Sequence, residues 1–350
     1  MGAPYFIRVQ DQTPTKFWIN NVTPEEAQLA IDNGAIGCTQ NPSYTWKMLN
    51  HPKQKYHALE LLDEILKSEP DDDMAESKLQ AALVQEVAAV FLPIYEQSKG
   101  KNGYVTIQEN PFREEKNFIV ERGYANRGEY GNIMIKIPAT VDGIAAIETL
   151  VRNGIPFNAT EVMSIDQAID VCKLYHNACL ESENTPVAVF SHIAGIFDEQ
   201  VKATAEKLNT DIAEDYLWQA GITVAKKIYQ VVKTHWPELG FVSGGARGLH
   251  HFTEMIGADA MVTINWKGTA DRLIEENPPI VQRFLQPTAY EVIDELTAKC
   301  EEFRKAYYIG SLTPEEYESF GPVVRFRTQF EEAWINAREF IKQRRAELGL

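Results

Sequence analysis

The sequence is poor in cysteine, with four in 350 residues. Cys38 and Cys300 lie far from any other cysteine, whereas Cys172 and Cys179 lie seven residues apart on one face of an expected helix. This spacing favours core packing over a disulfide framework or a zinc site. The cysteine content fits a protein of the reducing cytoplasm.

Positive charge is also scarce. Lysine and arginine number 34 against 50 aspartates and glutamates, which gives a formal net charge of -16 and an isoelectric point near 5.0. A nucleic-acid-binding protein needs a basic face, and a protein held electrostatically at a membrane surface needs a polybasic segment. The composition argues against both classes and is consistent with a soluble metabolic protein.

Long apolar runs are missing as well. The first residues, MGAPYFIRVQDQ, lack the charged start and apolar core of a signal peptide, and we expect no apolar stretch long enough to span a bilayer. No proline- or serine-rich linker and no low-complexity run divides the chain. With 44% hydrophobic residues, the chain can bury one large core.

What the sequence does contain is an alternation of short β-rich runs and longer amphipathic segments. Thr23 and Pro24 open one such segment as a helix cap and first helical residue. A β-then-α order repeated eight times predicts parallel strands in an α/β fold, a (β/α)8 TIM barrel. The expected strands are 16–20, 35–40, 104–109, 133–139, 155–161, 187–191, 240–245 and 259–264.

Two segments exceed a minimal barrel. One is a long helix expected from about Asp71 to Gln97, and the other is the helical tail after Pro279. We therefore expect a single domain over 1–350, with the barrel at about 16–275 and a C-terminal helical extension at about 280–350.

One lysine, Lys136, interrupts the apolar run IMIKIPAT at 133–140. Its side chain either reaches water or is held where an ammonium group is poorly solvated. The second case lowers the amine pKa and makes the nitrogen a nucleophile toward a carbonyl carbon. Reactive groups in such barrels lie at the carboxyl ends of strands, and these ends carry many amides and hydroxyls here. A polyhydroxylated carbonyl compound would need such a site.

Three segments resemble the transaldolase family, whose members are (β/α)8 enzymes that form a Schiff base. These segments are GAIGCTQNPS, IMIKIPATVDGIAAIETLVRNGIPFNATEVMS and ARGLHHFTEMIGADAMVTI. The resemblance runs in order from about Phe17 to Ile264 and is loose in the C-terminal extension. Its most specific part is the lysine strand with the segment that follows.

The resemblance implies four catalytic positions. Lys136 corresponds to the imine-forming lysine, and Thr160 to a threonine that helps to hold a catalytic water. The other two positions depart from the family pattern. Asn20, or Asn21 if the register slips, stands where an aspartate acts as acid and base, and Gln108 stands where a glutamate is usual. An amide at the latter place is similar to the fructose-6-phosphate aldolase branch, where it still positions water.

Four more positions are implied to bind substrate. Asn41 corresponds to an asparagine that contacts sugar hydroxyls, although it would also fit an Asx turn before Pro42. Asn158 lies beside the lysine. Ser191 ends the sixth strand, as a substrate contact or as a helix cap. Arg247 corresponds to a phosphate-binding arginine after the seventh strand.

The anion site also departs from the family pattern. Ile196 stands where a second arginine is expected, and Gly245 stands where a serine is expected, so an anion clamp would be weakened. The segment SGGARGLHHF still predicts a glycine-rich turn before a helix N-terminus, which favours an anion. We expect an anionic substrate tail, which could be a phosphate, a sulfonate or a carboxylate.

The lost carboxylates need a replacement, because an amide accepts no proton at neutral pH and losing a general base lowers a rate by about 10²–10⁴. His192 and Glu161 are the nearest candidates. By strand alternation Glu161 should point away from the barrel unless the strand ends at Thr160, which favours His192. Other polar and aromatic side chains are expected to be structural: Glu109, His250, His251, Phe326, Phe330, Trp334 and Phe340, of which one aromatic could touch substrate.

The resemblance thus implies a transferase of carbohydrate metabolism, of the pentose phosphate pathway type. Lys136 would attack a keto sugar, and a dihydroxyacetone unit would pass to an aldehyde acceptor. A class I aldolase acting on a phosphorylated or sulfonated ketose, and a catalytically weakened sugar-binding protein, remain alternatives. No metal or organic cofactor is expected, because the iminium itself polarises the substrate. The expected partner is a sugar or sugar phosphate, with no nucleic acid or membrane, and a homo-oligomer stays open.

Overall fold

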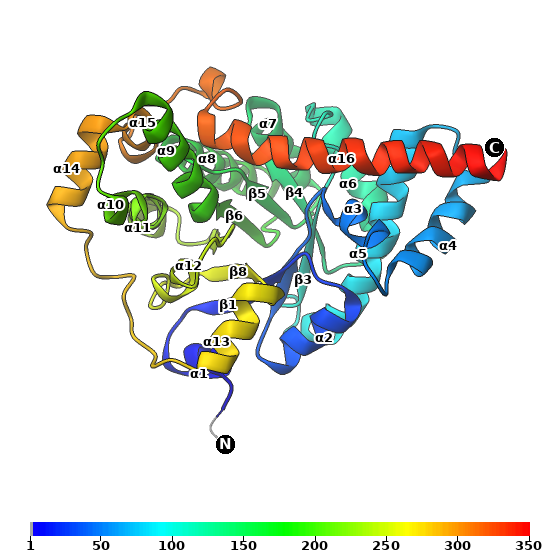
Figure 1. Cartoon of the computed structure of the whole chain (residues 1–350), viewed down its shortest axis with the longest axis horizontal. Helices are drawn as coiled ribbons and strands as arrows, with labels where there is room; N and C mark the ends of the chain where they lie inside the picture. Colours follow the sequence, from blue (N-terminus) through cyan, green and yellow to red (C-terminus); the bar gives the residue numbers. More distant parts are fainter. Residues whose placement is uncertain (1–2) are drawn as a thin grey trace.

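The computed structural model describes residues 3–350, and its centre is a closed barrel of eight strands in chain order (Figure 1). Every strand runs parallel to its neighbours, and β8 closes the barrel on β1. The predicted (β/α)8 barrel is confirmed, and all eight expected strands are present. They are β1 Lys16–Asn20, β2 Gly37–Thr39, β3 Tyr104–Gln108, β4 Ile133–Pro138, β5 Phe157–Thr160, β6 Ala188–His192, β7 Gly240–Ser243 and β8 Met261–Asn265.

Helices surround the barrel and extend beyond it. The helices before the last strand are α1 Tyr5–Gln12, α2 Pro24–Asp32, α3 Tyr44–Leu49, α4 Lys55–Leu66, α5 Asp72–Gln97, α6 Lys116–Arg127, α7 Val141–Arg152, α8 Ile165–Ser182, α9 Ala194–Leu208, α10 Glu214–Leu217, α11 Ala220–His235 and α12 His250–Thr253. Those after it are η1 Trp266–Ala270, α13 Asp271–Glu276, α14 Tyr290–Lys299, α15 Glu301–Tyr307, η2 Pro314–Glu316 and α16 Gly321–Leu348.

Side-chain caps fix where helices begin after the strands. The Thr23 hydroxyl accepts the Glu26 N–H while the Glu26 carboxylate accepts the Thr23 N–H, a capping box with Pro24 at the first helical position, as expected. Thr140 caps α7 and Ser164 caps α8. Because these caps lie close behind the ends of β1, β4 and β5, they hold the carboxyl ends of those strands in place.

Helix α5 matches the long helix expected from the sequence, but it corrects one expectation. In length and composition it is apolar enough to cross a bilayer. The expectation that no stretch of this chain is long and apolar enough is therefore wrong. In the fold α5 packs against β3 and against α2, α4, α6 and α16. Leu79, Val84 and Phe91 are buried in these contacts. We therefore describe it as a core helix of the barrel.

The C-terminal extension lies against two sides of the barrel. Figure 1 shows α14 and α15 beside α9 to α11, and α16 running as a long red helix from α9 toward α4. Asp166 of α8 accepts backbone N–H groups of the turn before η2, from Gly310, Ser311 and Leu312. These bonds tie the extension to α8, so the start of α16 has a fixed position over the barrel.

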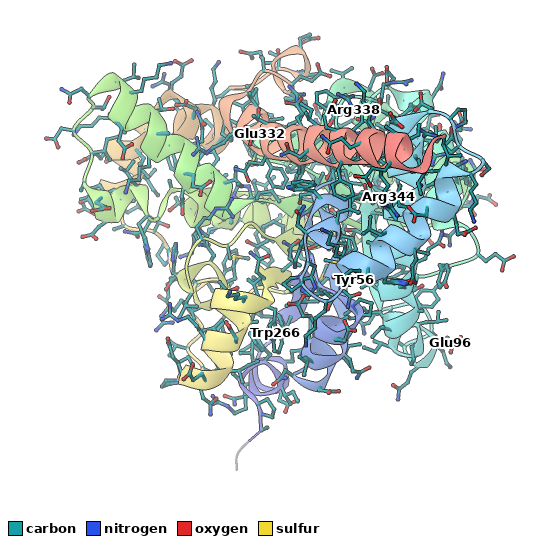
Figure 2. All side chains as sticks on the ribbon, turned by 45° about the vertical axis from the view of Figure 1, so that its right-hand side comes forward. Tyr56, Glu96, Trp266, Glu332, Arg338 and Arg344 are labelled. Carbon is teal, nitrogen blue, oxygen red and sulfur yellow. The ribbon has the colours of Figure 1, made fainter. Side chains whose placement is uncertain are left out.

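The far half of α16 is bound to α4 and α5. Arg344 forms two parallel hydrogen bonds with Asp63, at 2.8 and 2.7 Å, and Figure 2 shows Arg338 and Arg344 along the helix. The indole N–H of Trp334 donates to Asp73 over 3.0 Å, and Trp334 is fully buried. A bidentate arginine–carboxylate pair adds geometric specificity. These contacts set the rotation of α16 and so decide which of its side chains face the barrel.

Candidate active site

A cavity of about 290 Å³ opens at the carboxyl end of the barrel. It is lined by the ends of β1, β2, β4 and β6, by the turn after β7 and by the first half of α16. Five residues predicted for the site line it, namely Asn20, Asn41, Lys136, Ser191 and Arg247. The structure therefore brings these five side chains, from five different strand ends, around one space.

Lys136 lies on β4, and its side chain is only 4% exposed. Its Nζ donates to Oδ1 of Asn41 over 2.5 Å, and the ring centroids of Phe326 and Phe330 lie 5.7 and 5.5 Å away. Burial lowers the pKa of Lys136 to about 7, although the nearby Glu161 carboxylate opposes this. A substantial fraction of the amine is therefore uncharged, and nucleophilic, near neutral pH.

A chain of amides orients Asn41. Its Nδ2 donates to Oδ1 of Asn20 over 3.3 Å, and the same oxygen accepts the Thr39 hydroxyl over 2.7 Å. Asn20 in turn donates to Oδ1 of Asn265 over 2.9 Å. With its amide nitrogen committed to Asn20, Asn41 presents its oxygen to the amine of Lys136. The Asx turn considered from the sequence is not formed, since the side chain is used across the barrel.

The polar groups of β5 and β6 lie deeper in the barrel. In the strand register Asn158 is the partner of Lys136, and Thr160 is the partner of Pro138. The Ser191 hydroxyl donates to Oδ1 of Asn158 over 2.8 Å, so Ser191 is not a helix cap. Nδ2 of Asn158 and the Thr160 hydroxyl are buried without a hydrogen-bond partner among the described residues. Buried polar groups rarely stay unsatisfied, but neither residue lines the cavity beside Lys136.

Glu161 shows the largest difference from the alternation argument. Strand β5 ends at Thr160, and Glu161 has a φ of 64°, in the left-handed region. Such a conformation costs a non-glycine residue about 1–3 kcal/mol. Its carboxylate is fully buried, and Nε2 of Gln108, on β3, donates to Oε1 over 3.1 Å. The hydrogen bond thus links the end of β5 to β3, across β4, the strand of Lys136. The carboxylate therefore does not point away from the barrel.

His192 does not reach the cavity, so the preference for it as the acid/base group was wrong. The ring is fully buried, with Nδ1 at 2.9 Å from the Val162 carbonyl oxygen and Nε2 at 3.0 Å from the Gly221 carbonyl oxygen. Burial lowers its pKa to about 4. The reason is alternation along β6: Ser191 faces the barrel interior, so His192 faces the surrounding helices.

The surroundings of Arg247 differ from the sequence expectation. Nε of Arg247 lies 2.6 Å from the Glu199 carboxylate, and Nη2 lies 3.4 Å from Oε1 of Gln329. Ile196 is fully buried and provides no second cation. Instead Arg325 of α16 approaches the same Glu199 carboxylate, with Nε at 3.6 Å. Arg325 itself does not line the cavity, so Arg247 is the arginine that does.

The glycine-rich turn after β7 supports Arg247 without forming a helix N-terminal anion site. Gly245 has a φ of 68°, and a Cβ there would lie 2.3 Å from Cγ2 of Ile193. Helix α12 has four residues, and the Arg247 N–H donates to Nδ1 of His251. A helix this short has a weak dipole, and this N–H is already used. The prediction of an anion site at the N-terminus of this helix is therefore wrong.

The hydrogen bonds of His251 decide whether its ring nitrogens could bind a metal ion. Its Nδ1 accepts a backbone N–H, so Nε2 carries the ring proton and donates to Oδ2 of Asp198 over 3.0 Å. Neither ring nitrogen then has a lone pair free for a metal ion. The ring of His250 stacks on Trp218 at a centroid distance of 3.8 Å. We interpret this group as the structural support of the turn.

The aromatic side chains of α16 divide between the core and the cavity. Trp334 is buried, and Phe340 contacts the ring edge of Trp46. Phe326 and Phe330, which the sequence reading expected mainly in the core, line the cavity and keep water from Lys136. Low local polarity around the amine is what lowers its pKa.

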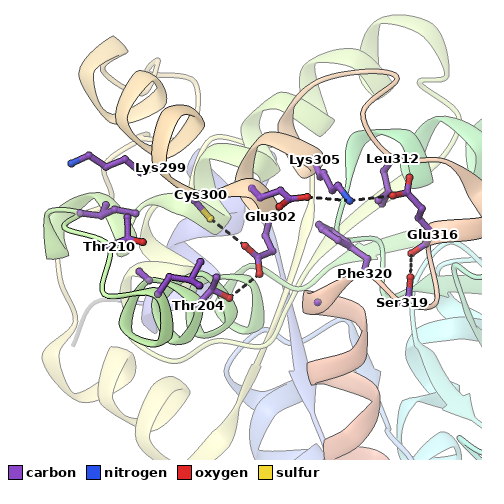
Figure 3. Close-up of a pocket in the computed structure, with 15 residues that line it drawn as sticks. Thr204, Thr210, Lys299, Cys300, Glu302, Lys305, Leu312, Glu316, Ser319 and Phe320 are labelled. Carbon is purple, nitrogen blue, oxygen red and sulfur yellow. Dashed lines mark hydrogen bonds and ion pairs between the residues drawn. The ribbon is translucent and has the colours of Figure 1, made fainter.

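A second cavity, of about 260 Å³, lies between α9 and the C-terminal extension (Figure 3). Its charged groups are paired with one another, since Lys305 lies 3.1 Å from Glu316 and the Thr204 hydroxyl donates to Glu302 over 2.8 Å. No residue predicted for the site lines it. The cavity at Lys136, and not this one, therefore gathers the residues predicted for the site.

Comparisons with known proteins identify the family of this chain. The sequence profile of a family described as Transaldolase/Fructose-6-phosphate aldolase matches residues 17–306. A transaldolase from Thiobacillus denitrificans is 23% identical over 323 residues, which cover 82% of this chain and 87% of the relative. One from Neisseria meningitidis is 27% identical over 248 residues, covering 67% and 68%. A solved 2,3-dimethylmalate lyase has 9% identity over 80% of this chain and 88% of its own, at a TM-score of 0.34 that carries no argument.

Proposed function

Because this chain belongs to the transaldolase/fructose-6-phosphate aldolase family, we propose that it transfers a three-carbon ketol unit between sugars through a Schiff base on Lys136. The observation that carries the proposal is the environment of that amine. It is buried, it has an amide instead of a carboxylate as its partner, and it faces a cavity of about 290 Å³. A neutral amine in such a place can attack a ketone carbon.

The proposed reaction begins when Nζ of Lys136 adds to the ketone carbon of a keto sugar. The carbinolamine loses water to give an iminium, which withdraws electrons while the C3–C4 bond breaks. The released aldehyde leaves, and the three-carbon enamine stays bound to Lys136 until it adds to an acceptor aldehyde. The iminium is the electron sink, so the sequence of steps requires no metal ion.

The side chains around the cavity suit a hydroxylated substrate with an anionic tail. Asn41 and Ser191 place an amide and a hydroxyl at the wall near Lys136, and Arg247 lies at the other end. Because Arg247 is paired with Glu199 in the unliganded protein, an anion must compete with that carboxylate. We propose a sugar phosphate, or a sugar with another anionic group, as the substrate.

Because its cysteines are free, we propose that the enzyme lies in the cytoplasm.

Intact-mass detection of a reduced adduct tests the proposal. The protein is mixed with phosphorylated, sulfonated and neutral ketoses and treated with borohydride, and the same mixtures are run with Lys136→Met. We expect a mass increase for at least one ketose in the wild type and none in the variant. An adduct that persists in Lys136→Met would remove this lysine as the nucleophile. No adduct with any ketose would favour a sugar-binding protein without transfer activity.

An aldolase is the second candidate. Two amides, Asn20 and Gln108, stand at strand ends where a carboxylate would be usual for transfer, and Gln108 is similar to the amide of the fructose-6-phosphate aldolase branch. In an aldolase the enamine takes a proton instead of adding to an acceptor. Product analysis with and without an aldehyde acceptor separates the two, since only an aldolase releases the three-carbon ketone when the acceptor is omitted.

A further inference from the structure

We propose that Glu161 is the proton donor for imine formation on Lys136, and that Gln108 is the positioning residue that holds its carboxyl group. The proposal rests on the imine chemistry proposed above and assigns a step that the amides at Asn20 and Gln108 cannot perform. Amides neither accept nor release protons at neutral pH.

The position of Glu161 follows from one backbone turn and one hydrogen bond. With a φ of 64°, Glu161 leaves the β5 alternation, and its Oε1 accepts the Gln108 N–H over 3.1 Å. Gln108 is the strand-register partner of Lys136 on the neighbouring strand. Oε2 of Glu161 is buried and has no hydrogen-bond partner among the described residues. One oxygen is therefore held while the other remains available.

A small space lies between Gln108 and Lys136. A cavity of about 10 Å³ is lined by Lys136 and Gln108, together with Asn110 and Glu114. This volume is about what one water molecule needs. Oε1 of Gln108 is buried without a partner among the described residues, so it would accept a hydrogen bond from that water. A water here would lie between Gln108, which holds Glu161, and Lys136.

Burial favours the protonated form of Glu161, and the charged groups around it modify this effect. The side chains that face it are Lys136 from β4, Glu114 from the loop after β3, and Arg327 and Glu331 from α16. Burial raises the pKa of Glu161, although the Gln108 hydrogen bond and the cations oppose this. Burial, with Glu161 as a neighbour, raises the pKa of Glu114 to about 9. Two buried carboxyl groups this close favour protonated forms.

The proposed step balances in atoms and charge. The neutral carbinolamine hydroxyl on the former ketone carbon takes the proton of the Glu161 carboxyl group, directly or through the water. The C–O bond then breaks, water leaves, and the nitrogen lone pair forms the C=N bond of the iminium. The products are an iminium cation on Lys136 and a carboxylate on Glu161. Before the step both groups are neutral, and after it they form a buried ion pair.

Two other titratable groups near the cavity do not fit this step. His192 faces the helices, with both ring nitrogens at backbone carbonyl oxygens. Glu109, the residue after Gln108, points outward as the sequence predicted, where Ser77 and Asn126 donate to its carboxylate. Glu109 is thus a partly buried carboxylate of the same strand end. It lines the same small cavity as Lys136, but Ser77, Asn126 and Arg122 already use its carboxylate, which makes it a matched control.

The test measures the rate of adduct formation with cyanoborohydride and a ketose that labels the wild type. We expect Glu161→Gln to lower this rate by about 10²–10⁴-fold, with unchanged binding of a non-reactive sugar analogue. Adding Gln108→Glu to Glu161→Gln returns a carboxyl group to the pair and should recover at least about tenfold. Glu109→Gln should stay within about twofold of the wild type.

A pH profile separates a proton donor from a structural residue. The wild-type rate should fall at alkaline pH as the donor loses its proton, and this alkaline limb should be absent in Glu161→Gln. A Glu161→Gln rate equal to that of the wild type, or an unchanged alkaline limb, overturns the proposal. If the wild type forms no adduct at Lys136, the imine function itself fails, which is a different result.

A second variant covers the case in which Glu161→Gln does not fold. Gln108→Met keeps the acid and removes the hydrogen bond that positions it, so adduct formation should slow about tenfold with an unchanged melting temperature. A wild-type rate in Gln108→Met would contradict the positioning role.

Discussion

Nζ of Lys136 lies 2.5 Å from Oδ1 of Asn41, and no carboxylate oxygen of residues 3–350 lies within ion-pair distance of that nitrogen. An amide oxygen accepts a hydrogen bond from either form of the amine, but it carries no full charge to hold a proton there. Burial therefore dominates and lowers the pKa of Lys136 to about 7. The residue that accepts the hydrogen bond of Lys136 therefore determines whether the amine is charged near neutral pH.

Changing Asn41 to aspartate should show this. Asn41→Asp places a carboxylate beside Lys136 and should raise the amine pKa by about 1–3 units. The acid limb of the pH–rate profile, where the amine becomes neutral, should move to higher pH by the same amount. Initial rates from about pH 5 to about pH 10 measure this, with Asn41→Ala as a control that removes the partner without adding charge. An unmoved limb in Asn41→Asp would contradict our account.

Lys136 should also reduce stability in a pH-dependent way. The pKa is lowered from 10.5 to about 7 on folding, so between these values the unfolded chain binds a proton that the folded protein does not. Wild-type stability from this group therefore rises with pH across that window. Lys136→Met should be more stable than the wild type by about 1–2 kcal/mol at neutral pH, with a smaller difference toward pH 10. Denaturant unfolding at several pH values measures it, and a pH-independent difference would argue against the lowered pKa.

The pairing of Arg247 with Glu199 should tune the preference for anionic substrates. Arg247→Gln should raise KM for a phosphorylated ketose about 10–100-fold, because a charge-assisted bond contributes about 1.5–3 kcal/mol. Glu199→Gln should lower the same KM several-fold, since the arginine no longer has a competing carboxylate. A neutral ketose serves as the control and should respond to neither change. Equal effects on charged and neutral ketoses would exclude Arg247 as an anion ligand.

Gly245 should tolerate no side chain. Gly245→Ala combines a φ of 68° with a Cβ at 2.3 Å from Ile193, and we expect a loss of about 2–4 kcal/mol in unfolding free energy. Gly268→Ala is the matched control, because Gly268 has a φ of 83° and open space around the added atom. Its loss should be about 1 kcal/mol, from the backbone alone. Thermal or denaturant unfolding compares the two, and equal losses would show that the clash is absorbed.

Local sequence patterns were enough to predict much of the barrel. The β-then-α order, the cap at Thr23 and the placement of Lys136 on β4 follow from short-range periodicity and side-chain sterics, which a sequence displays directly. The same periodicity places Ser191 on the inner face of β6, and it therefore also assigns His192 to the outer face. The alternation along β6 therefore argues against His192 as the acid/base group.

Other features depend on contacts between distant segments. Glu161 reaches Gln108 because one residue adopts a left-handed conformation at the end of β5, and no period predicts a single dihedral angle. Phe326 and Phe330 reach the cavity because α16 is anchored to α4 and α5 and crosses the barrel mouth.

The sequence by itself determined the strand order, the face on which Lys136 lies and the likeness of the chain to the transaldolase/fructose-6-phosphate aldolase family. Only the tertiary structure decided how reactive that lysine is. An amine pKa depends on the water and charge within a few ångströms of the nitrogen, and here these are set by Asn41, Phe326 and Phe330. These residues come together only when the barrel is closed and the last helix lies across it.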